Sequence, residues 1–188
     1  MSTTFDEALE RYLLEPVQAR REEVQQGILR HPRYDPRLVL PDTRGLGPQD
    51  RLHVLSRELP AALLNPRLHA EPARALAEAG DLAGAERQRR LAGLAIAGLR
   101  ASGTGRQEDP IAVLRVQDEY DLPETDGHTA VSQQLSRTPD AAFDVVTLDD
   151  GTVVWFELLW ERQAWRRSGV LGPTTGSAAP PTERAWEN

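Results

Sequence analysis

Apolar residues recur at helical spacing in the first half of the chain and alternate with polar residues in the second half. The helical spacing predicts three helices before the middle of the chain. Their expected ranges are 5–14, 16–29 and 48–59. Thr4 and Glu7 are spaced as a capping box, which favours a helix start at Phe5. Between the second and third helices we expect a loop, with a short extended piece at 38–40.

The clearest local signal is a helical hairpin over residues 66–102. Asn65 and Pro66 give an N-cap and a proline at the first helical position, Gly80 gives a C-terminal cap, and Asp81 starts the next helix. Small and apolar residues line one side of this second helix, namely Ala85, Ala92, Ile96 and Leu99. The hairpin resembles one unit of a tetratricopeptide repeat, but no second copy follows at a regular period.

After Gly105 the pattern changes to the alternation that is typical of strands. It predicts strands over 111–116, 129–135, 143–148 and 152–160, with a hairpin turn at Asp149-Asp150-Gly151. The expected fold is α+β, with an N-terminal helical region packed on a small antiparallel sheet of about four strands. We expect a helical region at 1–105, a β region at 106–168 and a disordered tail at 169–188.

Composition excludes several classes of chemistry. All 22 basic residues of the 188-residue chain are arginine, so no lysine is present for a P-loop or for a Schiff base. The lack of cysteine excludes disulfides, thiol catalysis and cysteine-ligated metal sites. The start of the chain is acidic where a signal peptide needs basic residues, and no run of about 20 apolar residues follows. We therefore expect a cytoplasmic protein without membrane contact.

Several motifs follow the hairpin in an order that resembles a known family. They are Ala101-Ser102-Gly103-Thr104-Gly105, Asp118-Glu119-Tyr120, Gln133-Gln134-Leu135, Phe143-Asp144-Val145 and Trp155-Phe156-Glu157. The family is a bacterial domain of unknown function with tetratricopeptide-like helices, an SGxG, a DEY and terminal β-strands. The resemblance implies a fold and no particular activity. In size, arginine-only basic content and lack of cysteine, the chain is also similar to the DNA-damage-response protein D family of radiation-resistant bacteria.

Arginines are the main candidates for binding. The hairpin and the segment after it carry Arg87, Arg89, Arg90, Arg100 and Arg106. Guanidinium groups bind phosphates and stack on bases, although pairing of these arginines with the second half of the chain, whose net charge is −8, is slightly favoured. A second cluster contains Trp165, Arg166 and Arg167. It could stack single-stranded bases, or it could be a helix that closes the sheet.

Two further patterns have a functional and a structural interpretation. The glycines of residues 102–106 could cradle a phosphate, but a glycine cap at the end of a helix is favoured. The acidic run from Asp118 to Asp126, followed by His128, could hold Mg²⁺ or Mn²⁺, but a solvated acidic loop is favoured. We therefore assign no catalytic residue, metal ligand or cofactor.

Three functions are compatible with these patterns. The first is a non-enzymatic interaction protein that binds a protein partner through its helical hairpin. The second is an accessory protein of a DNA-damage or stress response that binds single-stranded DNA through the arginine-rich helix face. The third is a divalent-metal-dependent hydrolase.

Overall fold

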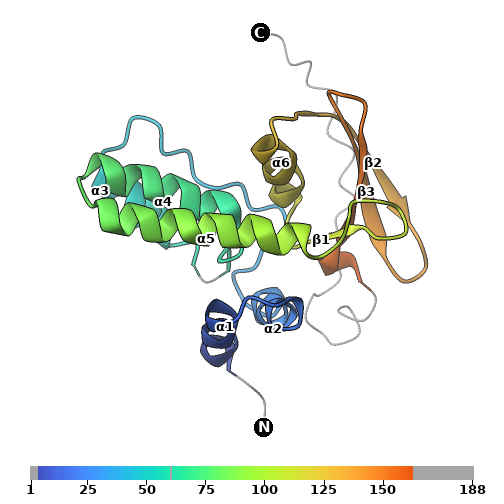
Figure 1. The fold of residues 1–188 in the computed structure, drawn as a ribbon, viewed down its shortest axis with the longest axis horizontal. Helices are drawn as coiled ribbons and strands as arrows, with labels where there is room; N and C mark the ends of the chain where they lie inside the picture. Colours follow the sequence, from blue (N-terminus) through green and yellow to red (C-terminus); the bar gives the residue numbers. More distant parts are fainter. Residues whose placement is uncertain (1–3, 60, 163–188) are drawn as a thin grey trace.

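The computed structural model describes residues 4–59 and 61–162, and it confirms the α+β class (Figure 1). In these residues six α-helices lie mostly before a four-stranded sheet whose strand order is β1-β4-β3-β2. The helices are α1 (Phe5–Leu14), α2 (Gln18–Leu29), α3 (Pro48–Ser56), α4 (Pro66–Glu78), α5 (Leu82–Arg100) and α6 (Val116–Thr125). The strands are β1 (Ile111–Val113), β2 (Ala130–Arg137), β3 (Ala142–Leu148) and β4 (Val153–Leu158), and a 3₁₀ turn, η1 (Leu159–Glu161), follows them.

Local capping interactions form as the sequence predicts. The Thr4 hydroxyl accepts from the N–H of Glu7, and the Glu7 carboxylate accepts from the N–H of Thr4, so the capping box of α1 is confirmed. In the hairpin of α4 and α5, Asn65 caps α4, and the Asp81 carboxylate accepts from Gly84 at the start of α5. Gly80 has φ +85° between the two helices, a conformation that favours glycine.

The sheet is mixed, because one of its strands is parallel to its neighbour. β2 pairs antiparallel with β3, β3 pairs antiparallel with β4, and Gly151 has φ +84° in the turn between β3 and β4. β1 runs parallel to β4, with Ile111 opposite Phe156, so the prediction of an all-antiparallel sheet is wrong at this strand. Alternation along a strand carries no information about its direction, and α6, β2 and β3 intervene between the two parallel strands.

α6 replaces the predicted acidic loop, and this is the largest error of the sequence interpretation. The Asp118 carboxylate accepts from the N–H groups of Arg115 (3.1 Å) and Leu114 (3.2 Å), so this acid caps the start of the helix. Asp118, Glu119 and Asp121 are at most 5% exposed, so these three carboxyl groups are not solvated. The extended piece expected at 38–40 is likewise not a strand.

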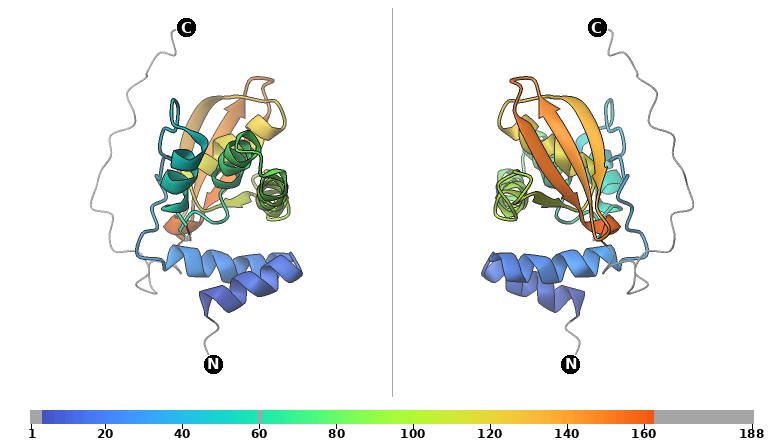
Figure 2. Two further views of the ribbon diagram at one scale, coloured as in Figure 1. Left: turned by 90° about the vertical axis from the view of Figure 1, so that its left-hand side faces the viewer. Right: turned by 90° about the vertical axis from the view of Figure 1, so that its right-hand side faces the viewer.

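Helices cover one face of the sheet. The main core joins Ile96 and Leu99 of α5 to Leu122 of α6 and to inward-facing strand residues such as Val146 and Phe156. The helices α3, α4 and α5 form a layer that extends away from the sheet, and α1 and α2 lie below it in Figure 1. In the right-hand view of Figure 2 the strands face the viewer, the other helices lie behind them, and α1 and α2 lie below. None of the helices in residues 4–59 and 61–162 is long and apolar enough to cross a membrane.

Candidate functional site

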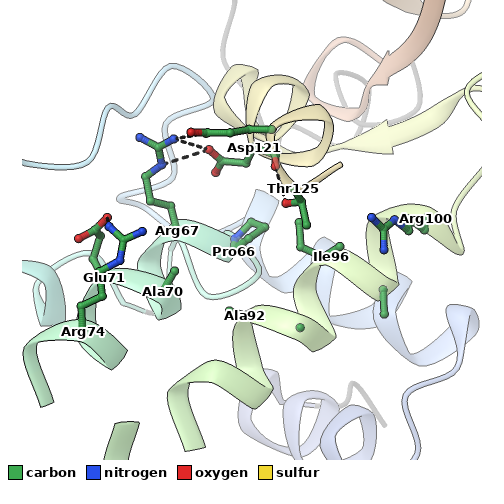
Figure 3. Close-up of a pocket in the computed structure, with 13 residues that line it drawn as sticks. Pro66, Arg67, Ala70, Glu71, Arg74, Ala92, Ile96, Arg100, Asp121 and Thr125 are labelled. Atoms are coloured by element: carbon green, nitrogen blue, oxygen red, sulfur yellow. Dashed lines mark hydrogen bonds and ion pairs between the residues drawn. The ribbon is translucent and has the colours of Figure 1, made fainter. Parts of the chain in front are cut away.

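A groove lies where α4, α5 and α6 meet (Figure 3). Its volume is about 630 Å³, within the usual range of ligand-binding clefts. Small or apolar residues of α4 and α5 form much of its lining: Pro66, Ala70, Ala92, Gly93, Ile96 and Ala97. Asp121, Glu124 and Thr125 of α6 form one wall. The small side chains that the sequence places on α5 therefore leave an open space here.

Charged residues at the edge of the groove are held in ion pairs. Arg67 contacts Asp121 (3.1 Å) and Glu124 (2.8 Å), and Arg74 pairs with Glu71 (3.0 Å). The side chain of Arg74 is 69% exposed, whereas that of Asp121 is only 5% exposed. Exposed pairs contribute little net stability. The guanidinium group of Arg74 is therefore able to exchange Glu71 for a carboxylate of a ligand.

Buried polar contacts attach the α6 wall to α4. The amide of Asn65 donates to Asp118 (3.1 Å) and to Asp121 (3.4 Å), and Gln117 donates to Asp121 (2.8 Å). Burial raises the pKa of both aspartates from their ordinary values, although the hydrogen bonds and neighbouring arginines act in the opposite direction. Asn65 also caps α4, so this one residue holds the α4 side and the α6 wall of the groove together.

A carboxyl pair lies between α6 and the sheet. The Gln133 amide donates to Glu119 (3.1 Å) and to Asp144 (2.6 Å), and the Tyr120 hydroxyl donates to Gln133. Burial, with the neighbouring Asp144 as the second cause, raises the pKa of Glu119 to about 10. Glu119 is 0% exposed, so its carboxyl group fastens α6 to β3 and does not face a substrate. This pair was not predicted from the sequence, although alternation places Asp144 on the same strand face as Val146.

The structure separates the arginines that the sequence proposed as one binding surface. Arg89 and Arg90 both pair with Glu86 of their own helix, at 3.6 and 3.2 Å. Arg100 pairs with Asp126, and it is the one member of the set that lines the groove. Arg87 and Arg106 are exposed and make no ion pair with the described part of the chain. The other candidates, Trp165, Arg166 and Arg167, lie outside the described residues.

The glycine-rich segment after α5 forms a tight turn. The N–H of Thr104 donates to the Asp109 carboxylate (2.9 Å), and the N–H of Gly105 donates to the Asp109 carbonyl oxygen (3.0 Å). A phosphate bound by this segment would need these same N–H groups, which are already hydrogen-bonded within the turn. The geometry therefore favours the structural interpretation, in which glycine permits φ +78° at Gly105.

Replacing Gly103 by alanine is expected to lower the free energy of unfolding by about 1–3 kcal/mol. A Cβ atom at this position would lie 2.1 Å from the carbonyl oxygen of Pro110, which is backbone and cannot rotate away. Urea denaturation measures the change. Gln107→Ala at an exposed position of the same turn serves as the control, with an expected change within about 0.5 kcal/mol. Equal stability of the two variants would contradict the close approach.

The carboxyl groups of the acidic run are held in separate contacts. Its buried members hold α6 in place, Glu124 pairs with Arg67, and Asp126 pairs with Arg100. Within residues 4–59 and 61–162, the group of ligand atoms close enough to hold a metal is His128 with Asp149 and Asp150. His128 Nδ1 lies 3.2 Å from Asp149 and 3.8 Å from Asp150, all three side chains being partly exposed. Such exposed groups are common without an ion, so we assign no metal here.

Comparisons with protein-family models, with curated proteins and with solved structures find no match. The resemblance to the bacterial domain family and the similarity to the damage-response family therefore stay predictions. The candidate site rests on the geometry of the groove.

Proposed function

We propose that the protein is a non-enzymatic interaction protein that binds an apolar segment of a partner protein in the groove between α4, α5 and α6. One observation carries the proposal: a cleft of about 630 Å³, lined by small and aliphatic residues of α4 and α5 together with charged residues, lies on the helical hairpin. Grooves between helices commonly receive a peptide whose apolar side chains enter the cleft.

The titratable groups around the groove support binding rather than catalysis. Asp118 and Asp121 accept hydrogen bonds from Asn65, and Glu119 of α6 is buried against the sheet. A general base has to reach the proton that it removes. Each of these carboxyl groups instead holds one structural element against another.

The expected ligand is a segment with leucine, isoleucine or valine side chains and a neighbouring carboxylate. The aliphatic side chains match Ala92 and Ile96 in the groove. The carboxylate matches Arg74 and Arg100, whose side chains are 69% and 50% exposed and whose ion pairs are on the surface. Charge therefore orients the segment, and burial of apolar area supplies most of the affinity.

Replacing Gly93 by leucine is expected to abolish binding without unfolding the protein. A Cβ atom at Gly93 meets no heavy atom within 4 Å, so the new side chain occupies the groove that the ligand needs. The measurement uses peptides selected from a random phage-displayed library on the wild-type protein. We expect the selected peptides to be rich in aliphatic residues and to lose on the order of 10-fold or more in affinity for Gly93→Leu.

Ala83→Leu provides the matched control, because Ala83 is an exposed position of α5 away from the groove. It adds the same side chain to the same helix and is expected to leave peptide affinity unchanged. Peptides that bind Gly93→Leu as tightly as the wild-type protein would place the binding site elsewhere and overturn the proposal.

A further inference from the structure

The two edges of the sheet differ in length and exposure. β1, at one edge, has three residues that are all buried. β2, at the other edge, has eight residues, and within the described part of the chain it pairs with β3 alone. Its residues from Val131 to Leu135 are all exposed, and the strand forms a margin of the sheet in Figure 2.

β2 lacks most features that keep a sheet edge from pairing. Edge strands are usually short, or they carry charges, prolines or bulges. From Ala130 to Ser136 there is no charged residue and no proline, and the one irregularity of register falls at the start, between Ala130 and Ser132. The rest of the strand is regular and uncharged up to Arg137.

The backbone of β2 presents groups along its open side that have no strand partner among residues 4–59 and 61–162. The N–H of Thr138 donates to the carbonyl oxygen of Ala141, so the backbone groups of Thr138 point toward the β3 side of the hairpin. Direction alternates along an antiparallel strand. The N–H and C=O groups of Gln133, Leu135 and Arg137 therefore point away from β3, in the spacing that another strand requires.

Large side chains beside this edge are exposed in the described part of the chain. Val131, Leu135 and Tyr120 are 63%, 44% and 38% exposed. Arg137 makes no ion pair within residues 4–59 and 61–162, although its charge acts on Asp144. The apolar side chains of Val131 and Leu135 and the cationic side chain of Arg137 thus lie on the strand whose outward N–H and C=O groups have no strand partner in the described chain.

We propose that β2 pairs antiparallel with β2 of a second copy of the chain, about a two-fold axis at Leu135. This register places Leu135 opposite the partner's Leu135 and Gln133 opposite the partner's Arg137. It joins the four strands of each copy into one continuous sheet. A two-fold axis repeats every contact, so both edges are covered at once.

Charge complementarity selects a second copy as the occupant. Gln133 lies over the carboxyl groups of Glu119 and Asp144, to which its amide donates. Neither carboxyl group has an ion pair within the described ranges 4–59 and 61–162. Directly opposed residues of paired strands lie on the same face, so the partner's Arg137 comes beside this acid pair. The same contact recurs on the other side of the axis.

Disulfide cross-linking tests the register directly, because the chain contains no cysteine. Opposed residues of a hydrogen-bonded antiparallel pair have Cα atoms about 5.5 Å apart, which suits a disulfide. Under mild oxidation, Leu135→Cys is expected to become mostly a disulfide-linked dimer. Val39→Cys, at a 77% exposed apolar position in the loop between α2 and α3, is the control and is expected to stay mostly monomeric.

Leu135→Pro tests the edge by a second route. The N–H of Leu135 points away from β3, so proline removes a hydrogen bond to the partner strand and none to β3. Sedimentation equilibrium is expected to show a dimer for the wild-type protein and half that mass for Leu135→Pro, with the circular dichroism spectrum unchanged. A further control, Gly93→Leu, is expected to stay dimeric, which separates this interface from the groove.

Two results would overturn the proposal. One is a wild-type protein that sediments as a monomer at its highest soluble concentration, with Leu135→Cys cross-linking no faster than Val39→Cys. The other is a folded Leu135→Pro variant that remains a dimer, because the interface would then lie away from β2.

Discussion

Replacing Glu119 by glutamine is expected to stabilise the protein, by about 2 kcal/mol or more at pH 8. The buried Glu119 carboxyl group lies beside Asp144, and both burial and this neighbour raise its pKa from 4.5 to about 10. At pH 8 the folded protein must therefore hold a proton that the unfolded chain has released. Glutamine keeps the shape, accepts from Gln133 and donates to Asp144 without binding a proton.

The effect has a defined pH dependence. A raised carboxyl pKa means that the folded state binds more protons than the unfolded state between about pH 4.5 and pH 10. The free energy of unfolding of the wild-type protein should therefore fall across this window as the pH rises. The contribution of Glu119 to stability is largest below the lower limit, and the advantage of Glu119→Gln should grow from pH 5 to pH 9.

Urea denaturation at pH 5, 7 and 9 measures this difference. Glu124→Gln is the matched control, because Glu124 is on the same helix but its side chain is 69% exposed. Its effect is expected to stay within about 1 kcal/mol at each pH. A wild-type protein that is more stable than Glu119→Gln at pH 9 would show that the carboxyl pair is not protonated in the fold.

Two glycines of α5 should respond to alanine in opposite directions. At Gly98 a Cβ atom would lie 2.7 Å from Nε and 2.8 Å from Cδ of Arg21, and 3.0 Å from the Tyr12 hydroxyl. Arg21 is only 1% exposed, so its side chain has little room to move. Gly98→Ala is therefore expected to lower the free energy of unfolding by about 1–3 kcal/mol. Gly93→Ala fills open space and should raise it by roughly 0.5–1 kcal/mol, the usual gain within a helix.

A double-mutant cycle identifies the cause of the Gly98 effect. If the new methyl group collides with Arg21, Gly98→Ala should cost much less in an Arg21→Ala background than in the wild-type protein. Equal costs in both backgrounds would contradict the collision with Arg21. Either result also reports on the contact through which α2 packs against α5, because Arg21 lies on α2 and approaches Gly98.

The groove was only partly predictable. Sequence placed Ala92 and Ile96 on one side of α5 among small and apolar residues. In the structure α4 packs along α5, and Ala92 and Ile96 also line the cleft that these two helices form with α6. The α6 wall that bounds the cleft had no helical prediction, because charged residues at Asp118 and Glu119 indicated a solvated loop.

The sequence by itself determined the features that depend on neighbours along the chain. The capping box of α1, the turn at Gly80 and the turn at Gly151 all involve residues within a few positions of each other. Their hydrogen bonds and backbone angles are available to any chain with those residues in that order. The α+β class followed from the same local patterns.

Only the tertiary structure decided the role of the charged residues. Asn65 donates a hydrogen bond to Asp118, which lies 53 residues later in the chain. Glu119 of α6 accepts from Gln133 of β2 and lies beside Asp144 of β3. Whether a carboxyl group faces water or the interior depends on these distant partners, and the order of residues along the chain does not specify them. The same limit applies to the parallel direction of β1 beside β4, since hydrogen bonding between the strands, and not the order of their residues, sets it.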